Sequence, residues 1–205
     1  MPLILLEGPR NSGKTHLSGI ISQPKFKFDF TGVYGGLRLH ATNPKTHALG
    51  LGKEIMLHQL YRDGFLGKNL IVDRGILTNQ VWGIYQNRVS YEDIFPEIDF
   101  MCESGLMENV EIVLIKSDSP SSFRQNKDHW DHLENMEGRK LELSIFNTVS
   151  DYFKSKRIKI HEFINQMDES SETEFKKMIS NIICVEYKKK KNYLRIRFIL
   201  YLIEA

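Results

Sequence analysis

The residues best suited to chemistry lie near the start of the sequence, where an apolar run leads into a glycine-rich loop. Residues 8–15 are GPRNSGKT, which matches the spacing G-x-x-x-x-G-K-[ST]. Glycines let such a loop curl so that successive backbone N–H groups point at phosphate oxygens. Its lysine reaches the β- and γ-phosphates, and its last hydroxyl holds Mg²⁺. The spacing predicts a P-loop that binds a nucleoside triphosphate through Gly8, Pro9, Arg10, Asn11, Ser12, Gly13, Lys14 and Thr15.

The segments on either side of the loop support this prediction. Leu3–Leu6 is a short apolar run that is typical of a buried parallel strand, and His16–Ser22 continues as a short helix before Pro24. A strand, a glycine-rich turn and a helix form the context that this motif requires, and the helix adds the positive end of its dipole. The alternative, an ordinary strand–helix turn, is disfavoured by this context.

A second group of candidate residues follows the apolar segment Leu70–Val72. Asp73 and Arg74 stand at the carboxyl end of this predicted strand, where ligands bind in open α/β sheets. The aspartate is suited to hold Mg²⁺ or to take a proton from an acceptor. The arginine is suited to neutralise charge that develops during phosphoryl transfer. A surface ion pair at the end of a strand is the simpler alternative.

The acceptor of the phosphoryl group has weaker candidates. Thr78 and Trp82, one helical turn apart, are candidate acceptor-binding residues. The Trp82 ring is suited to stack on a base, although most tryptophans serve only in packing. Asp29, at the end of a predicted strand over 25–30, is a candidate base or acceptor contact.

Residues 117–138 are polar and carry basic, acidic and histidine side chains, among them Arg124 and Lys127. A lid that closes over the triphosphate is one interpretation of this segment, and a solvated helix face is the other. Both stay open at this point.

The composition fits one domain with an ordinary core. The chain has 205 residues, of which 41% are hydrophobic and 26% charged, and no run is long enough to span a membrane. The two cysteines, Cys102 and Cys184, have neither metal-ligand nor redox spacing. We therefore expect reduced thiols and a cytoplasmic protein, in the host cytoplasm if the source is viral.

The small net charge of +2 conceals an asymmetry. Residues 187–205 carry six lysines and arginines against one glutamate, a local charge of +5, which leaves about −3 for residues 1–186. We expect a kinase-type domain over 1–184 and a basic, apolar extension over 185–205. The extension is suited to an anionic membrane surface or DNA, but a solvated basic run whose apolar part packs on the domain is the favoured interpretation.

The candidate residues need a scaffold, and the hydrophobic pattern predicts a parallel one. Strand-like segments at residues 3–6, 25–30, 70–72, 111–115 and 157–163 alternate with helical patterns. Residues 31–50 are predicted to form a long loop. Pro96 is expected near the first turn of its helix, and Ser171 with Glu174 forms a predicted capping box. The pattern predicts the α/β class, with a five-stranded parallel sheet covered on both faces.

With these motifs in place, the sequence resembles a known group of enzymes. LILLEGPRNSGKTHL followed by LIVDRGILTNQVWGIY is similar to the thymidylate kinase and deoxynucleoside kinase group of P-loop kinases. The resemblance implies a three-layer P-loop NTPase fold with a lid, and ATP with Mg²⁺ as the phosphoryl donor. It implies that Lys14 and Thr15 hold phosphates and Mg²⁺ and that Asp73 serves the metal or proton transfer. It also implies that Arg74 positions phosphates and that Arg124 acts from the lid.

The sequence also departs from this group in two ways. Thymidylate kinases have an Arg-Phe-Pro-type stretch after the second strand that grips the monophosphate, whereas the present chain has FKFDFTGVYGGLRLH, with Arg38 as a late substitute. Their P-loop often carries an acidic residue where this one has Arg10. The first hypothesis is an ATP-dependent kinase of deoxynucleoside monophosphates. A kinase that phosphorylates hydroxymethylated bases in phage DNA is the alternative, and a non-catalytic nucleotide-binding switch is the third. The oligomeric state stays open, with a homodimer among the options.

Overall fold

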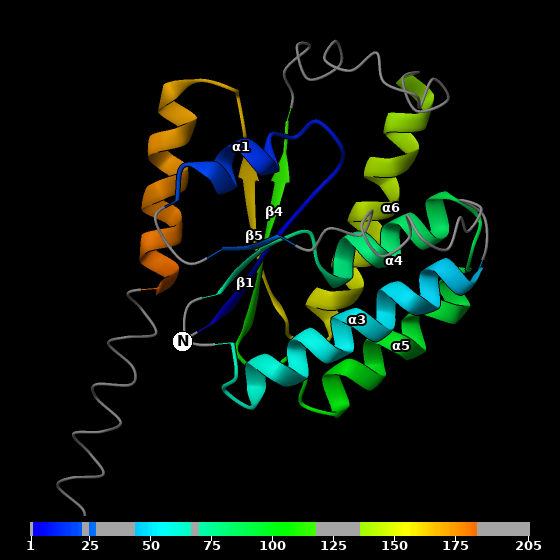
Figure 1. Cartoon of the computed structure of the whole chain (residues 1–205). Coiled ribbons are helices and arrows are strands. Elements are labelled where there is room, and N and C mark those ends of the chain that lie inside the picture. The colour runs from blue at the N-terminus through cyan, green and yellow to red at the C-terminus, as the bar shows by residue number, and fades with distance from the viewer. Residues whose placement is uncertain (1, 22–24, 28–43, 67–69, 118–135, 184–205) are drawn as a thin grey trace, which may run out of the picture.

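A computed structural model of the chain describes residues 2–21, 25–27, 44–66, 70–117 and 136–183. A parallel sheet runs through the middle, and helices cover both of its faces (Figure 1). This confirms the predicted α/β class. No helix in the described part of the chain is long and apolar enough to cross a bilayer.

The sheet has the strand order β2-β3-β1-β4-β5, and all of its pairings are parallel. Four strands form its body: β3 (Ile71–Asp73), β1 (Leu3–Glu7), β4 (Val110–Lys116) and β5 (Lys159–Ile164). At one edge, β2 (Lys25–Lys27) adds only three residues beside β3. In the central pair Leu6 lies opposite Asp73, so the ends of β1 and β3 meet at the same edge.

One face of the sheet is covered by four helices: α3 (Pro44–Arg62), α4 (Ile76–Tyr85), α5 (Tyr91–Glu103) and α6 (Met136–Ser155). Alternate residues of β1, such as Leu3 and Leu5, pack here because neighbouring side chains of a strand point to opposite faces. The helices contribute fully buried side chains such as Val81, Ile98 and Phe146. This is the larger of the two cores.

The opposite face is covered by α1 (Lys14–Gly19) and by a helix over residues 169–183. In Figure 1 this second helix is the orange one beside β5. Ile4 and Leu6 point to this face and meet Leu17 and Phe175 in a second buried cluster. Because both faces of β1 are buried, Leu3–Leu6 is apolar throughout, as the sequence predicted, and only Glu7 at the end of the strand carries a polar group.

The boundaries of several elements differ from those expected. The predicted loop over 31–50 ends early, because α3 already begins at Pro44, whose fixed φ suits the start of a helix. The first helix begins at Lys14 and not at His16. Residues 28–43, and with them the rest of the predicted second strand, lie outside the described residues.

The proposed caps also need correction. Helix 169–183 is not capped by Ser171; the Asp168 carboxylate accepts a hydrogen bond from the Ser171 N–H at 2.8 Å and so caps the helix three residues earlier. Pro96 lies in the second turn of α5, and not in the first, because Ser90 and Asp93 form a capping box that starts this helix at Tyr91.

His58 predicts how the stability of this core depends on pH. Its side chain on α3 is buried, and its Nδ1–H donates to the Leu106 carbonyl at 3.0 Å. Burial lowers the pKa of His58 to about 4. The nearest carboxyl, Glu54, lies 3.9 Å away and has a pKa raised by burial, so it carries little charge in acid.

The contribution of His58 to the free energy of unfolding should therefore fall as the pH drops from about 6.5 to about 4, because the unfolded chain takes up a proton that the folded His58 refuses. Buried carboxyls with a raised pKa, such as Glu7 and Glu54, act in the opposite direction, so the contribution is measured as a difference between two proteins. The variant His58→Gln keeps a donor and cannot charge, and its stability relative to the wild type should rise by up to about 3 kcal/mol over this pH range in urea titrations. The same pH dependence in the two proteins would show that His58 does not contribute to it.

Candidate active site

The P-loop lies between β1 and α1, at the carboxyl edge of the sheet. Its curl depends on three residues with positive φ: Gly8 at 141°, Asn11 at 57° and Gly13 at 81°. A Cβ at Gly8 would collide with the backbone carbonyl of Ile115 on the neighbouring strand β4. Gly8 is thus required both by its backbone conformation and by the close approach of β4.

The Lys14 side chain curls back over the loop. Its Nζ donates to the carbonyl oxygens of Gly8 and Pro9, both at 2.6 Å, and to Oγ of Ser12 at 3.2 Å. Burial lowers the pKa of Lys14 to about 8, and the nearby Arg74 adds to this effect. A phosphate in the loop would offer this ammonium stronger, charged acceptors than the carbonyls.

Thr15 and Asp73 are in direct contact, although 58 positions separate them in the sequence. The Thr15 hydroxyl donates to Oδ2 of Asp73 at 3.0 Å. The second oxygen, Oδ1, is buried and has no hydrogen-bond partner within the described part of the chain. A hydroxyl and a carboxylate with an unused oxygen suit Mg²⁺, which prefers oxygen ligands and keeps several waters or phosphate oxygens. The predicted metal residues therefore fit the ion.

Arg74 follows directly and turns the chain from β3 into α4. It takes a left-handed conformation with φ of 71°, and its N–H donates to the Leu6 carbonyl at 3.0 Å. Its side chain is exposed at the edge of the sheet, near enough to Lys14 and Arg10 to lower the pKa of both. Three cations therefore gather at the P-loop.

A residue that the sequence analysis did not single out, Glu7, holds this turn in place. Its carboxylate accepts hydrogen bonds from the N–H groups of Gly75, Leu77 and Thr78 at 3.0 to 3.2 Å, and from the Thr78 hydroxyl. Burial raises the pKa of Glu7 to about 7 against these bonds. Glu7 thus fixes the start of α4 relative to the P-loop that it precedes.

This contact also locates Thr78, a predicted acceptor residue. Its side chain is buried, and its hydroxyl is engaged by Glu7. Contact with an acceptor stays a prediction for Thr78.

Glu142 of α6 is a second missed residue. Its carboxylate is buried against the P-loop and accepts a hydrogen bond from the Arg10 N–H at 3.1 Å. Burial raises the pKa of Glu142, while Lys14 and Arg10 oppose that rise.

The half-buried Trp82 does not lie on an open surface, because the Arg10 guanidinium covers its ring, with Cζ 4.2 Å from the ring centroid.

Asn165 supports the other side of the loop. It follows β5, is buried, and its Nδ2 donates to the Ser12 carbonyl at 2.9 Å. A Cβ at Gly13 would collide with this amide, so Gly13 and Asn165 fit each other closely. Its place directly after a strand is the signal that could have identified it, as for Asp73.

Three predicted site residues cannot be placed. Asp29, Arg38 and Arg124 lie outside the described residues, as does most of the predicted lid. The last residues of that segment, from Met136, already belong to α6.

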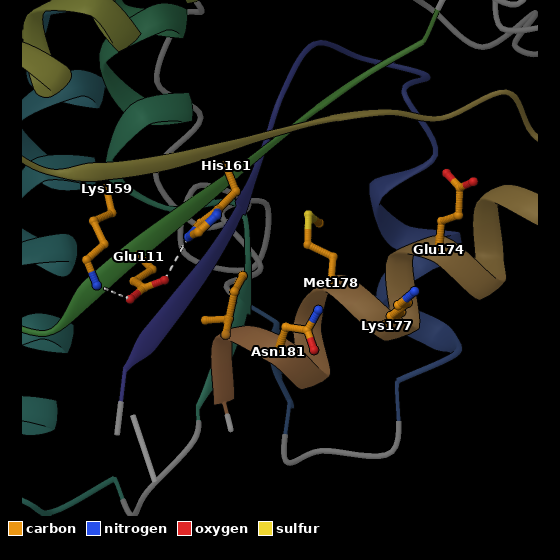
Figure 2. A pocket seen from close by; sticks show the side chains of 8 residues that line it. Glu111, Lys159, His161, Glu174, Lys177, Met178 and Asn181 are labelled. Atoms are coloured by element: carbon orange, nitrogen blue, oxygen red, sulfur yellow. Dashed lines mark hydrogen bonds and ion pairs between the residues drawn. The ribbon is translucent and has the colours of Figure 1, made fainter. Parts of the chain in front are cut away.

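A separate hollow lies away from the P-loop, between the starts of β4 and β5 and the helix 169–183 (Figure 2). It has a volume of about 460 Å³. On its floor Glu111 pairs with Lys159 and His161, both at 2.7 Å, and Met178 and Asn181 face it from the helix. None of the predicted site residues that the structure describes lines this hollow.

Comparison with known proteins supports the fold. No protein-family model matches the sequence, and no curated protein matches it significantly. Among solved structures, thymidylate kinase from Candida albicans is similar, with 17% identity, a TM-score of 0.61, and coverage of 88% of this chain and 91% of that chain.

Two further structures are similar. Deoxyadenosine kinase from M. mycoides, solved with dCMP and dCDP, is 18% identical, with a TM-score of 0.53 and coverage of 90% of this chain and 98% of that one. The YorR protein from Bacillus subtilis, in complex with phosphorylated GDP, is 14% identical, with a TM-score of 0.57 and coverage of 91% and 98%. The fold is thus that of P-loop nucleotide kinases, which confirms the resemblance at the level of structure.

The close fit of Gly8 predicts a strong effect of substitution. Gly8→Ala should lower the free energy of unfolding by more than about 2 kcal/mol, because the new Cβ meets backbone that cannot move aside. The matched control is Gly52→Ala in α3, where a Cβ meets nothing and stability should rise by about 0.5–1 kcal/mol. Similar stabilities of the two variants in thermal and urea unfolding would contradict the described loop.

The lowered pKa of Lys14 predicts a pH dependence of nucleotide binding. The ammonium is charged below about pH 8 in the free protein and loses its charge above it. The affinity for ATP, measured by calorimetry, should therefore be level from pH 6.5 to 7.5 and fall up to about tenfold per unit well above pH 8. In Lys14→Met the affinity should be lower throughout and should lack this fall. An unchanged affinity of the wild type up to pH 9.5 would argue against a role for the Lys14 charge.

Proposed function

We propose that this protein is an ATP-dependent phosphotransferase that passes the γ-phosphate to a nucleotide-type acceptor, with a deoxynucleoside monophosphate as the first candidate. The observation that carries the proposal is the hydrogen bond between Thr15 of the P-loop and Asp73 of β3, beside Lys14. It brings both sequence motifs to one point at the carboxyl edge of the sheet. The similarity to nucleotide kinases supports the same reaction class.

In this proposal the P-loop N–H groups and Lys14 hold the β- and γ-phosphates of ATP. Thr15 and Asp73 would hold Mg²⁺, which supplies charge neutralisation of the phosphates when bound. Arg74 stands where negative charge develops between donor and acceptor and stabilises it there. Such catalysis consists of positioning and electrostatic stabilisation, so buried and pre-oriented groups are what it requires.

Glu7 supports this arrangement without touching substrate. Its carboxylate accepts hydrogen bonds from three N–H groups at the start of α4 and so fixes the turn from β3 into α4, next to Asp73 and Arg74. Arg124 would act from a lid that excludes water, and Asp29 and Arg38 would contact the acceptor; these roles stay predictions from the sequence.

A kinase acting on hydroxymethylated bases in DNA is the second candidate. It is favoured by the absence of the usual monophosphate clamp after the second strand and by the basic extension over 185–205. Incubation with labelled ATP and either free deoxynucleoside monophosphates or DNA that contains 5-hydroxymethyluracil separates the two. Label only in the small-molecule pool would exclude the DNA reaction, and label only in the polymer would exclude the first candidate. Nucleotide binding without transfer to any acceptor would favour a switch.

The role of Asp73 predicts that Asp73→Asn loses phosphoryl transfer while it keeps the fold. The amide retains the shape but not the charge, so kcat should fall about 10²-fold or more. The control is Asp151→Asn on the exposed face of α6, whose activity should be unchanged. Circular dichroism and thermal unfolding report whether the fold is kept. Full activity of Asp73→Asn would disprove the assignment of this residue.

A further inference from the structure

The P-loop of this chain carries, besides Lys14, a second cation that contacts α4. Arg10 extends its guanidinium over Trp82 of α4, with Cζ 4.2 Å from the ring centroid. A guanidinium over a tryptophan face is attracted by the ring quadrupole, and the attraction grows as water is removed. Arg10 is half-buried, and this burial lowers the pKa of its guanidinium.

Both sides of this contact are supported by other residues. The Arg10 N–H donates to the buried Glu142 carboxylate at 3.1 Å, which fixes the backbone of the loop against α6. The Trp82 ring lies against Tyr85, with centroids 5.3 Å apart and the planes tilted by 54°. Arg10 is therefore held by two helices, and not only by its own loop.

The position of this contact distinguishes two sides of the P-loop. On one side Asn165 and Met167, which follow β5, pack against Ser12 and Gly13. Arg10 lies on the other side, toward α4. This is the helix that begins after Asp73 and Arg74, the pair expected to face the acceptor.

A second cation shares that side. Arg74 ends the turn that leads into α4, and its charge lowers the pKa of Arg10, whereas the Glu142 carboxylate raises it. A phosphate near both guanidinium groups would be attracted by both charges, since a guanidinium binds phosphate oxygens through two parallel N–H bonds.

We infer that Arg10 is the residue that selects a phosphate-bearing acceptor, a free nucleoside monophosphate, and that Trp82 and Glu142 are its positioning residues. Trp82 then holds the arginine by its ring face and does not stack on the base. The inference rests on the proposed kinase function. It adds a phosphate contact to the acceptor contacts proposed for Asp29 and Arg38, and it gives a role to an arginine at a P-loop position that is often acidic in thymidylate kinases.

The test compares Arg10→Gln, Trp82→Leu and Trp82→Phe with the wild type. Each of the four deoxynucleoside monophosphates and its unphosphorylated nucleoside is offered as acceptor with saturating ATP. Calorimetry measures the binding of ATP alone and of each monophosphate alone to the same proteins. Arg62→Lys at the exposed end of α3 is the control and should behave as the wild type.

In Arg10→Gln the KM for the preferred monophosphate should rise about tenfold or more, because one charge-assisted hydrogen bond is lost. The affinity for ATP should change less than about threefold. Trp82→Leu should raise the same KM with little change in kcat, and Trp82→Phe should restore most of it, because a phenyl ring keeps the cation–π contact. If Trp82 served only in packing, Trp82→Leu would instead impair the use of nucleosides and monophosphates alike, and Trp82→Phe would not restore the KM of the monophosphate alone.

Three results would overturn the inference. The first is a loss of ATP affinity in Arg10→Gln with an unchanged KM for the monophosphate. The second is equal use of nucleosides and monophosphates as acceptors by the wild type, and the third is phosphate label that enters only DNA. If the wild type transfers phosphate to nothing, the proposed function fails, but calorimetry still decides the inference. Weaker monophosphate binding in Arg10→Gln would then support it, and equal binding would reject it.

Discussion

The hydrogen bond between Thr15 and Asp73 is the contact on which the organisation of the site depends. It joins the first turn after β1 to the end of β3, and it exists because these strands are parallel neighbours with Leu6 opposite Asp73. Since parallel strands end at the same edge, groups that follow them are brought together without a long loop to hold them. One oxygen of Asp73 stays buried and without a partner in the described structure, which is costly unless a ligand engages it.

The surroundings of this contact combine charge with burial. Lys14 is enclosed at the loop, and burial raises the pKa of both Glu7 and Glu142 beside it. Glu7, which precedes the P-loop, accepts hydrogen bonds from the start of α4, and Glu142 of α6 accepts one from the P-loop backbone. Asn165, which follows β5, donates to another backbone carbonyl of the loop. The loop is thus braced by residues from elements on both sides of β1, so its donors are oriented before any phosphate arrives. Such pre-orientation is what phosphoryl transfer uses, because little reorganisation is left for the reaction itself.

The parts of this architecture that could be predicted from the sequence are those that local patterns determine. The alternation of strand-like and helical segments predicted the α/β class, and the P-loop spacing together with the Asp73–Arg74 pair predicted that the two motifs meet at one edge of the sheet. Glu7 and Glu142 were missed because their roles arise only when distant elements pack, whereas the place of Asn165 directly after a strand could have identified it. Nothing in their local sequence distinguishes a buried carboxylate on α6 from a solvated one. Trp82 shows the same limit, since its type suggested stacking while its partner, Arg10, is 72 positions away in the sequence.

The central claim is that Lys14, Thr15 and Asp73 surround one metal–phosphate cluster. It is tested most directly by a crystal structure with a non-hydrolysable ATP analogue and Mn²⁺, whose anomalous signal locates the metal without assumptions. The account predicts a single peak bound to the Thr15 hydroxyl at about 2.0–2.2 Å, with Asp73 bound to it directly or through one water and Lys14 on the phosphates. A metal peak away from Asp73, or a nucleotide bound outside the loop of residues 8–15, would contradict it.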